Sequence, residues 1–359
     1  MEKIKILVIQ QKMIGDVLTS SIICNNLKLI YPDSQVDYLI YPFTKPVVEN
    51  NPNIDNLLLF EEKYKSDKIE FFKFLLRIRK SKYDIVIDAY GKIESQLFVI
   101  FSGAKIKIGF QKSKLAFIYN VKFPYIPIAQ TNAGTAIENR LNLLSSLKGN
   151  LVVDNKPKIF LTESEIKNGK KILLDNEIDF SKPIFMISVI GSGETKTYPA
   201  KYMAEILDYI VGKTEATLLF NYMPSQKKEA RIIFNLCQTT TQEKIKIDVI
   251  PGSIREFLSL TYHCNALIGN EGGAVNMAKA IQVPTFTIFS TWINKASWNS
   301  FEDEKTNVSV HLKDLKPELY GNNTAKQMKK KAMLLYESFK PELIIPLVDN
   351  YFLVNKKSK

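Results

Sequence analysis

The chain has 359 residues, of which 45% are hydrophobic and 11% aromatic, and this length exceeds what one globular core usually holds. Average contents of Gly and Pro, and the lack of a long apolar run, exclude collagen-like, disordered and membrane-spanning classes. Three distant cysteines without CxxC spacing predict buried thiols rather than a disulfide framework or a zinc site. The first residues run into a strand pattern without signal-peptide features, so we expect a cytoplasmic protein.

The formal net charge of +12 is distributed unevenly along the chain. Basic residues exceed acidic ones by six in residues 1–155, by one in residues 156–324 and by five in residues 325–359. Two basic ends around a nearly neutral middle indicate that one part of the molecule faces an anionic partner, such as nucleic acid, an acidic lipid surface or an acidic glycan. The alternative is an ordinary lysine-rich surface, because only five of the 49 cations are Arg.

Strand and helix patterns alternate along the whole chain. The N-terminal strand KIKILVI is followed by a loop over 10–16 and a helix over 17–31, which ends before Pro32. Further strands are predicted over 36–41, 83–91, 106–110, 183–190, 216–222, 246–250, 265–270 and 284–290, with helices over 70–80, 162–176, 202–211, 227–236, 254–262 and 275–280. This order predicts an α/β protein with two successive Rossmann-like domains, each a parallel sheet covered by helices.

In open parallel sheets, ligands bind at the carboxyl ends of the strands. The chemistry is therefore expected in the loops over 10–16, 190–199, 221–226 and 270–276, and two sheets that face each other would bring these loops together. No GxGxxG follows the first strand, and the Gly-Lys-Thr at 212–214 ends a predicted helix, so the usual nucleotide signatures are absent. With only His263 and His311 in the chain, a histidine-based metal site or triad is also disfavoured.

Each of three loops has a functional and a structural interpretation. Asp16 follows a Gly at a helix start, where it is either a reactive carboxylate or a plain N-cap. The loop over 190–199 offers free amides, hydroxyls and Lys196 to a diphosphate, or else it is a flexible Gly/Ser linker. The Gly pair after Glu271 permits close approach of a phosphate or ribose, or else it forms a tight turn with an acidic N-cap.

Together these loops resemble glycosyltransferase family 9, the lipopolysaccharide heptosyltransferase group. The resemblance is strongest in residues 5–40, 83–91 and 267–290, which read KILVIQQKMIGDVLTSSIICNNLKLIYPDSQVDYLI, YDIVIDAYG and LIGNEGGAVNMAKAIQVPTFTIFS. It implies the GT-B fold, with two Rossmann-like domains that face each other across a cleft. The implied divisions are an acceptor domain over 1–160, a donor domain over 161–324, and C-terminal helices over 325–359 that cross back to pack on the N-terminal domain.

The resemblance also implies roles for individual residues. Asp16 matches the family's proposed catalytic base, and Lys196, followed by Tyr198 and Pro199, matches the lysine that binds the donor diphosphate. The implied donor-binding residues are Met13, Gly15, Ser192, Thr195, Gln226, Glu271, Gly272, Gly273 and Asn276. Four of these depart from the family pattern. Glu271 replaces the family's Asp, Gly272 replaces Ser or Thr, Asn276 replaces His, and Gln226 replaces Glu.

The resemblance predicts an inverting, metal-independent glycosyltransferase that moves heptose from ADP-heptose to a lipopolysaccharide core acceptor, with no cofactor. The partners expected are a nucleotide sugar, an anionic lipid-linked glycan and the cytoplasmic face of the inner membrane, where the protein associates peripherally, and not nucleic acid. Acceptor binding is expected at Lys12, Lys105, Lys107, Lys112 and Lys114. Two alternatives are a family 9 transferase with another nucleotide-sugar donor and a non-catalytic relative that binds sugar nucleotides or glycans.

Overall fold

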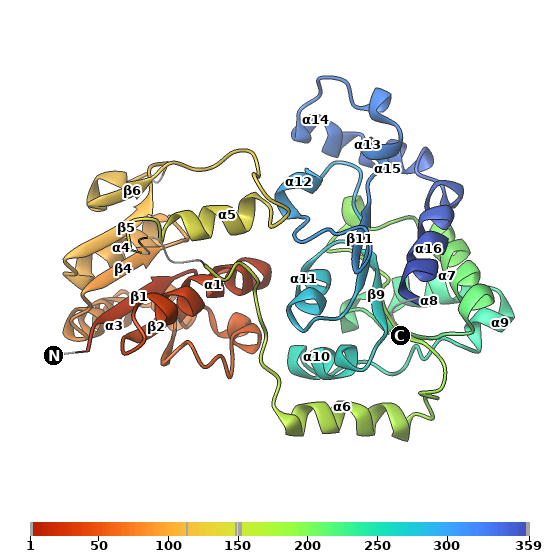
Figure 1. The fold of residues 1–359 in the computed structure, drawn as a ribbon, viewed down its shortest axis with the longest axis horizontal. Helices are drawn as coiled ribbons and strands as arrows, with labels where there is room; N and C mark the ends of the chain where they lie inside the picture. The colour runs from red at the N-terminus through yellow and green to blue at the C-terminus, as the bar shows by residue number, and fades with distance from the viewer. Residues whose placement is uncertain (1–2, 113, 148, 150–152, 357–359) are drawn as a thin grey trace. The chain divides into compact units, whose positions relative to one another are not determined.

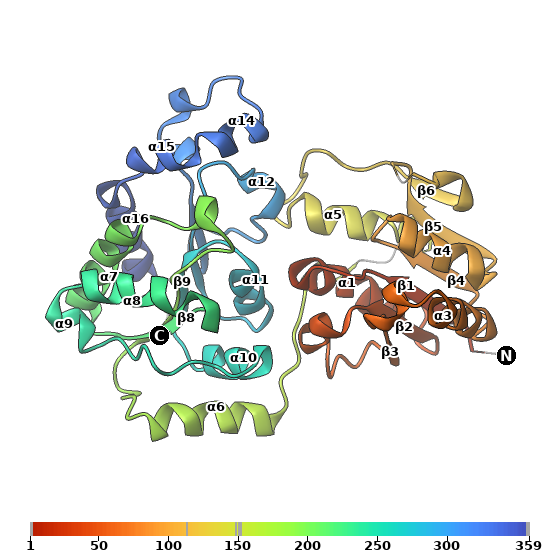
Figure 2. The same ribbon diagram turned by 180° about the vertical axis from the view of Figure 1, so that it is seen from behind.

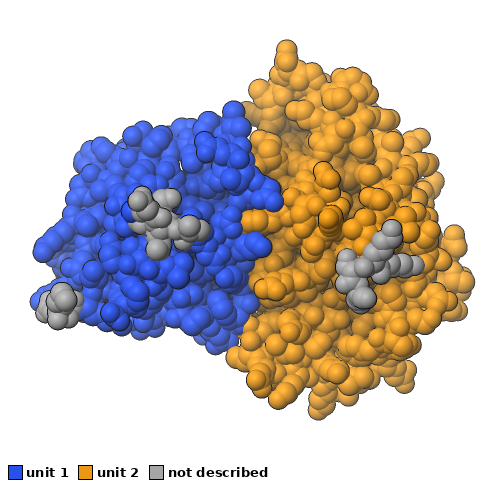
Figure 3. Space-filling view, viewed as in Figure 1, with its two compact units in different colours: residues 1–160 blue, residues 161–359 orange. Residues whose placement is uncertain are grey.

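The computed structural model describes residues 3–112, 114–147, 149 and 153–356, which form two compact units. Unit 1 spans 1–160 and unit 2 spans 161–359 (Figure 3). The boundary between the units falls after residue 160, the position expected from the sequence. Each unit has a parallel sheet of its own, as the alternating pattern predicts.

The sheet of unit 1 has the strand order β3-β2-β1-β4-β5-β6 (Figure 1). Its strands are β1 (Lys5–Ile9), β2 (Gln35–Ile40), β3 (Asn56–Leu59), β4 (Ile85–Asp88), β5 (Ile106–Phe110) and β6 (Val121–Phe123). Its helices are α1 (Ile14–Ile30), η1 (Pro42–Val47), α2 (Lys63–Ser66), α3 (Lys68–Lys80), α4 (Ile93–Ser102), η2 (Ala116–Ile118) and α5 (Thr135–Asn142). Strands β3 and β6 and helices α4 and α5 were not predicted from the sequence.

Helices cover both faces of this sheet. Two successive residues of β2 point to opposite faces of the sheet. Leu39 packs in a core with α3, α4 and η2, whereas the Tyr38 hydroxyl donates to the Val17 carbonyl of α1 at 2.8 Å. The strands are short continuous apolar runs since both faces are buried. This layering leaves the strand ends and the loops that follow them as the polar edge of the unit.

The sheet of unit 2 has the strand order β11-β10-β9-β7-β8. Its strands are β7 (Ile184–Ser188), β8 (Thr217–Asn221), β9 (Ala266–Asn270), β10 (Thr285–Ile288) and β11 (Asn307–Val310). Its helices are α6 (Glu163–Asp175), η3 (Glu194–Lys196), α7 (Ala200–Thr214), η4 (Pro224–Gln226), α8 (Lys227–Leu236), α9 (Thr239–Gln242), α10 (Ile254–Tyr262), α11 (Gly273–Ala280), α12 (Lys295–Trp298), α13 (Leu312–Leu315), η5 (Pro317–Leu319), α14 (Ala325–Lys330), α15 (Ala332–Glu337) and α16 (Pro341–Lys356).

The strand predicted over 246–250 is wrong. Among the described residues, a single bridge between Leu218 and Ile245 extends the sheet beyond β8. The backbone then turns, because the Val249 amide donates to the Lys246 carbonyl at 3.2 Å. The backbone of this short segment therefore forms local turn hydrogen bonds instead of pairing with a neighbouring strand.

The C-terminal helices require a correction. Residues 325–359 were expected to pack on the N-terminal domain, but their buried side chains belong to the core of unit 2. Figures 1 and 2 show α16 beside α7, and the Phe352 ring stacks on Phe185 of β7 at 5.3 Å. The Tyr198 hydroxyl, in the loop after β7, donates to the Phe339 carbonyl at 2.6 Å. The apolar face of α16 predicts burial, but it carries no information on which core buries it.

The cysteines and histidines have structural roles, as expected. Cys24, Cys237 and Cys264 are free and buried, and burial raises the pKa of the Cys237 thiol to about 12. His311 caps α13 by accepting the Lys313 amide at Nδ1. Within the described ranges, no cluster of three or more His, Cys, Asp or Glu side chains is placed to hold a metal ion. The same residues include no helix with the length and apolarity required to span a bilayer.

Candidate active site

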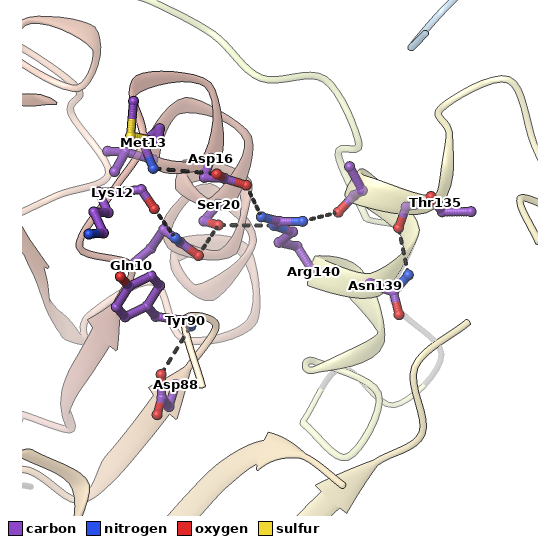
Figure 4. Close-up of polar contacts among 12 residues, drawn as sticks. Gln10, Lys12, Met13, Asp16, Ser20, Asp88, Tyr90, Thr135, Asn139 and Arg140 are labelled. Atoms are coloured by element: carbon purple, nitrogen blue, oxygen red, sulfur yellow. Dashed lines mark hydrogen bonds and ion pairs between the residues drawn. The ribbon is translucent and has the colours of Figure 1, made fainter. Parts of the chain in front are cut away.

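Asp16 lies in the first turn of α1, at the end of the sheet where β1 finishes (Figure 4). Its Oδ2 accepts the Met13 amide at 3.3 Å, so the capping interpretation holds for one oxygen. Its Oδ1 accepts from the Arg140 Nη2 at 2.8 Å. The side chain keeps 28% exposure, so the carboxylate is oriented by the protein and still reachable from solvent.

Arg140, which the sequence analysis did not single out, organises this corner of unit 1. It comes from α5, and its Nε donates to the Ser20 hydroxyl at 3.1 Å while its Nη1 donates to the Ala136 carbonyl at 3.0 Å. Its side chain is only 12% exposed. Because the planar guanidinium makes three directed contacts, it fixes one oxygen of Asp16 in space. The only signal in the sequence was the rarity of Arg in this chain.

Two further contacts brace the loop that precedes Asp16. The Gln10 amide nitrogen donates to the Lys12 carbonyl at 2.7 Å, and its oxygen accepts the Ser20 hydroxyl at 3.3 Å (Figure 4). Ser20 thus connects Gln10 with Arg140. Met13 and Gly15, expected to bind the donor, lie on either side of this braced turn, and Met13 is 59% exposed. No contact of the described residues distinguishes them as donor ligands.

The neighbouring loop, after β4, is built on a buried carboxylate. Asp88 pairs in register with Ile9, and its Oδ1 accepts the amides of Tyr90 at 3.0 Å and Gly91 at 2.8 Å. Burial raises the pKa of the Asp88 carboxyl, against the hydrogen bonds from Gly91, Tyr119, Ser95 and Tyr90 that lower it. This network holds Tyr90 beside the start of α1 (Figure 4). The apolar pattern predicts this strand but not the structural function of its aspartate.

A second tyrosine at the same edge carries basic neighbours. The Tyr41 hydroxyl, after β2, donates to Glu94 at 3.1 Å. The ammonium groups of Lys65 and Lys12 lie 4.3 and 5.9 Å from the centre of its ring. Of the expected acceptor-binding lysines, Lys12 therefore lies at the edge that carries Asp16.

The other expected acceptor-binding lysines divide between the two edges of the sheet. Lys112 follows the end of β5, with its ammonium 5.4 Å from the Tyr125 ring centre, and Lys114 comes two residues later. Lys105 and Lys107 instead lie at the beginning of β5, where both backbones bond to the Asn120 side chain. Because β5 runs parallel to β1 and β4, its beginning is at the opposite edge from Asp16. Lys105 and Lys107 are thus wrongly placed for a role beside Asp16.

In unit 2, Lys196 is held by an ordered turn after β7. A Cβ on Gly191 would lie 2.1 Å from the Lys196 carbonyl oxygen, so only glycine allows the chain to double back here. The Gly191 amide donates to the Thr197 hydroxyl at 3.1 Å, which in turn donates to the Gly193 carbonyl at 2.9 Å. The interpretation of this segment as a flexible linker is therefore wrong.

The Lys196 ammonium pairs with Glu271, which follows β9, at an Nζ–Oε1 distance of 3.4 Å. Lys196 is 27% exposed and Glu271 only 9%. The Ser290 hydroxyl lies 3.5 Å from the same Glu271 oxygen. The two residues that the sequence analysis assigned to separate loops are thus neighbours, and the ammonium has an internal counter-charge.

Buried Asn270 joins the loops after β7 and β9. Its Oδ1 accepts the Tyr198 amide at 2.7 Å, and its Nδ2 donates to the Ser188 and Val189 carbonyls at 2.9 and 3.0 Å. Gly272, with φ of 153°, then leads into Gly273, the first residue of α11. A Cβ on either glycine would meet nothing within 4 Å, so the space in front of this helix start is open. Asn276, one turn later, is half-buried.

Two more loops reach the same edge of unit 2. The Gln226 amide nitrogen donates to the Gly191 carbonyl at 3.1 Å, and Trp292, after β10, donates through its indole to the Thr195 carbonyl at 3.0 Å. The Lys196 and Lys329 ammonium groups lie 5.7 and 5.0 Å from the Trp292 ring. Ser192, which precedes Lys196 in the same loop, is exposed. The expected convergence of post-strand loops is therefore confirmed within unit 2, and Trp292 and Lys329 are additions to it.

Comparison with known proteins identifies the family. The model of glycosyltransferase family 9 (heptosyltransferase) matches residues 71–328. The chain is 24% identical over 289 residues to lipopolysaccharide heptosyltransferase 1 of Campylobacter coli, a match that covers 79% of this chain and 83% of that protein.

Solved structures show the same fold. A family 9 glycosyl transferase from Veillonella parvula DSM 2008 matches with a TM-score of 0.71 and 16% identity, over 93% of this chain and 97% of that one. The ADP-heptose lipopolysaccharide heptosyltransferase II of Escherichia coli matches with a TM-score of 0.67 and 15% identity, over 93% and 99% of the two chains. The expected GT-B fold class, with two Rossmann-like domains, is thereby confirmed.

Proposed function

The chain belongs to glycosyltransferase family 9, the heptosyltransferase family, and from this premise we propose that it transfers heptose from an ADP-linked donor to a lipopolysaccharide core acceptor. Two relatives support the sugar and the acceptor, namely lipopolysaccharide heptosyltransferase 1 of Campylobacter coli and the ADP-heptose lipopolysaccharide heptosyltransferase II of Escherichia coli. The transfer is a single displacement with inversion at the anomeric carbon and uses no metal ion or cofactor. Unit 1 binds the acceptor, and unit 2 binds the donor.

Asp16 is the general base of this reaction. The acceptor oxygen forms a bond to the anomeric carbon, the bond from that carbon to the diphosphate oxygen breaks, and the acceptor proton passes to the carboxylate. Support comes from the orientation of Asp16 by Arg140 and Met13, together with its remaining exposure. A positioned base typically contributes roughly 10²- to 10⁴-fold to the rate.

Lys196 stabilises the departing diphosphate. Its ammonium lies beside the open helix start at Gly272 and Gly273, whose amides suit phosphate oxygens. The donor diphosphate replaces Glu271 as the counter-charge of Lys196, because the 3.4 Å pair is long and its ammonium is partly exposed. This positive charge fulfils the role that a metal ion has in other transferases.

Membrane association follows from the acceptor and from the charge. Within the compact units, basic residues exceed acidic ones by 23 to 15 in residues 1–160 and by 26 to 22 in residues 161–359. The basic C-terminal segment belongs to unit 2, so unit 1 alone carries the larger excess. We expect a cytoplasmic enzyme that associates peripherally with the anionic inner membrane.

The observation that carries the proposal is that family membership coincides with an oriented carboxylate at Asp16 and a paired ammonium at Lys196. The test is a donor panel of ADP-heptose and ADP-, GDP- and UDP-hexoses, measured by thermal shift and by mass spectrometry of products on a heptose-free core acceptor. We expect ADP-heptose to raise the melting temperature and to give product. No product with any ADP-linked sugar would overturn the assignment of the donor.

A second candidate is transfer from another nucleotide sugar, favoured by one contact. Glu271 stands where the family has Asp, and it reaches Lys196. A longer carboxylate at the donor phosphates changes what they contact, so selective product formation with a UDP- or GDP-sugar would support this candidate. The same panel therefore separates the two.

A further inference from the structure

The outer face of unit 1 carries an apolar stripe on α3. Ile69, Phe72 and Leu76, spaced i, i+3 and i+7, are 68, 51 and 40% exposed. The core of unit 1 receives the opposite side of the helix, through Phe74, Leu75 and Ile78. The stripe therefore points directly away from the sheet.

The stripe continues onto two neighbouring elements of the same layer. The Phe72 ring meets Phe101 of α4 edge to face at 6.2 Å. Ile100 of α4 is 41% exposed, and Phe117 of η2, which packs in the same core layer, is 79% exposed. An apolar surface of this extent exceeds the single exposed hydrophobic residues that are normal for proteins.

Cations surround this surface. Helix α3 carries five basic residues and one acid, and they lie on both flanks of the stripe, with Lys68 and Arg79 on one side and Lys73, Arg77 and Lys80 on the other. Glu70 pairs with Lys73 at 2.7 Å.

We propose that the face formed by α3, α4 and η2 is the surface by which unit 1 docks on an anionic phospholipid bilayer. Phe, Leu and Ile opposite a core, with lysines and arginines beside them, are the composition that inserts at the interface of headgroups and acyl chains. The charge complements anionic headgroups, and the exposed apolar side chains between the cations fit acyl chains, which an acidic protein surface does not offer.

Docking through this face leaves the strand ends accessible. In a parallel sheet, helices that follow strands begin near the carboxyl edge, so α4 starts beside Asp88 and Tyr90. The Tyr41–Glu94 contact joins the first turn of α4 to the edge that holds Lys12. A lipid-linked acceptor in the bilayer would then meet the catalytic edge from the side. This inference rests on the proposed function in one respect, namely that the acceptor is linked to a lipid in the bilayer.

The test is sedimentation of the full chain with vesicles of phosphatidylglycerol and phosphatidylethanolamine, against vesicles of phosphatidylcholine. We expect binding only to the anionic vesicles, weakened between about 0.05 and about 0.5 M salt. The double variants Phe72→Ser/Leu76→Ser and Lys68→Glu/Lys80→Glu should each bind at least roughly tenfold more weakly, since each nearby cation is worth about fivefold.

Matched controls come from unit 2. Leu174→Ser/Phe180→Ser removes two exposed apolar side chains in an acidic setting, and Lys201→Glu/Lys228→Glu reverses two exposed lysines. Both controls should bind like the native chain. Equal binding by the α3 variants, or equal loss in the controls, would overturn the proposal, as would failure of the native chain to bind anionic vesicles.

Activity on a delipidated, water-soluble acceptor separates this inference from the proposed function. The α3 variants should keep native turnover on that acceptor, which also shows that they fold, and lose turnover on acceptor embedded in vesicles. A native chain that binds vesicles but transfers no sugar would contradict the function and leave the docking face standing. If the α3 variants transfer sugar to the embedded acceptor as well as the native chain does, the docking face is contradicted and the proposed function stands.

Discussion

The two charged groups assigned to the reaction are neutralised in different ways. In unit 1, Asp16 contacts a guanidinium at 2.8 Å that is itself anchored by two further hydrogen bonds. In unit 2, Lys196 contacts the Glu271 carboxylate at 3.4 Å, and the Ser290 hydroxyl lies 3.5 Å from the same oxygen. The first arrangement orients a carboxylate permanently. The second leaves an ammonium with a partner that an incoming anion can displace.

This difference predicts that changes in unit 1 act mainly on turnover, whereas changes in unit 2 act on donor affinity as well. Four variants test it, in order of decreasing effect.

Asp16→Asn should lower kcat roughly 10²- to 10⁴-fold, because the amide cannot take the acceptor proton. The shape is retained, so the thermal shift caused by ADP-heptose should not change. Turnover is measured by product mass spectrometry, with exposed Asp33→Asn as the matched control. Near-native turnover of Asp16→Asn would remove Asp16 from the role of base.

Lys196→Met should lower kcat/KM roughly 10²- to 10³-fold, the cost of losing one preorganised group at a developing anion. Donor affinity should fall too, since the ammonium contacts the diphosphate before reaction. Lys201→Met, at an exposed lysine at the start of α7, is the control. If Lys196→Met loses turnover with unaltered donor affinity, the diphosphate contact is made only in the transition state.

Arg140→Met should lower kcat about tenfold while the KM for the donor stays constant, because the guanidinium positions Asp16 and touches no donor group. The free energy of unfolding should fall by about 1 kcal/mol, as expected for a partly exposed ion pair. Arg140→Lys should recover part of kcat through one contact to Asp16. A variant that changes stability alone would show that Arg140 is structural.

Glu271→Gln should tighten donor binding about fivefold, since the diphosphate no longer displaces a carboxylate from Lys196, an effect of about 1 kcal/mol. Isothermal titration with ADP-heptose measures it, and Glu271→Asp, which restores the family residue, is the comparison. Weaker binding by Glu271→Gln would mean that Glu271 holds the sugar hydroxyls rather than competing with the phosphates.

Much of the molecule follows from local patterns. Continuous apolar runs identify parallel strands because both faces of such a sheet are buried, and Pro32 marks the end of α1. The placement of Asp16 and Lys196 shortly after the ends of β1 and β7 follows from the same alternation. The position of the unit boundary after residue 160 is predictable for the same reason. The strand predicted over 246–250 is wrong, because an alternating pattern of only five residues does not distinguish a strand from a turn.

Only the tertiary structure decided the partners. Arg140 reaches Asp16 across 124 positions, and Trp292 reaches Thr195 across 97, distances in sequence that no periodicity records. The core that buries α16, the edge at which Lys105 and Lys107 lie, and the pairing of Lys196 with Glu271 were decided in the same way. The sequence determines which faces are apolar and which loops are polar, since these are local properties. Which surfaces meet depends on packing that minimises exposed apolar area and buried unpaired charge over the whole unit at once.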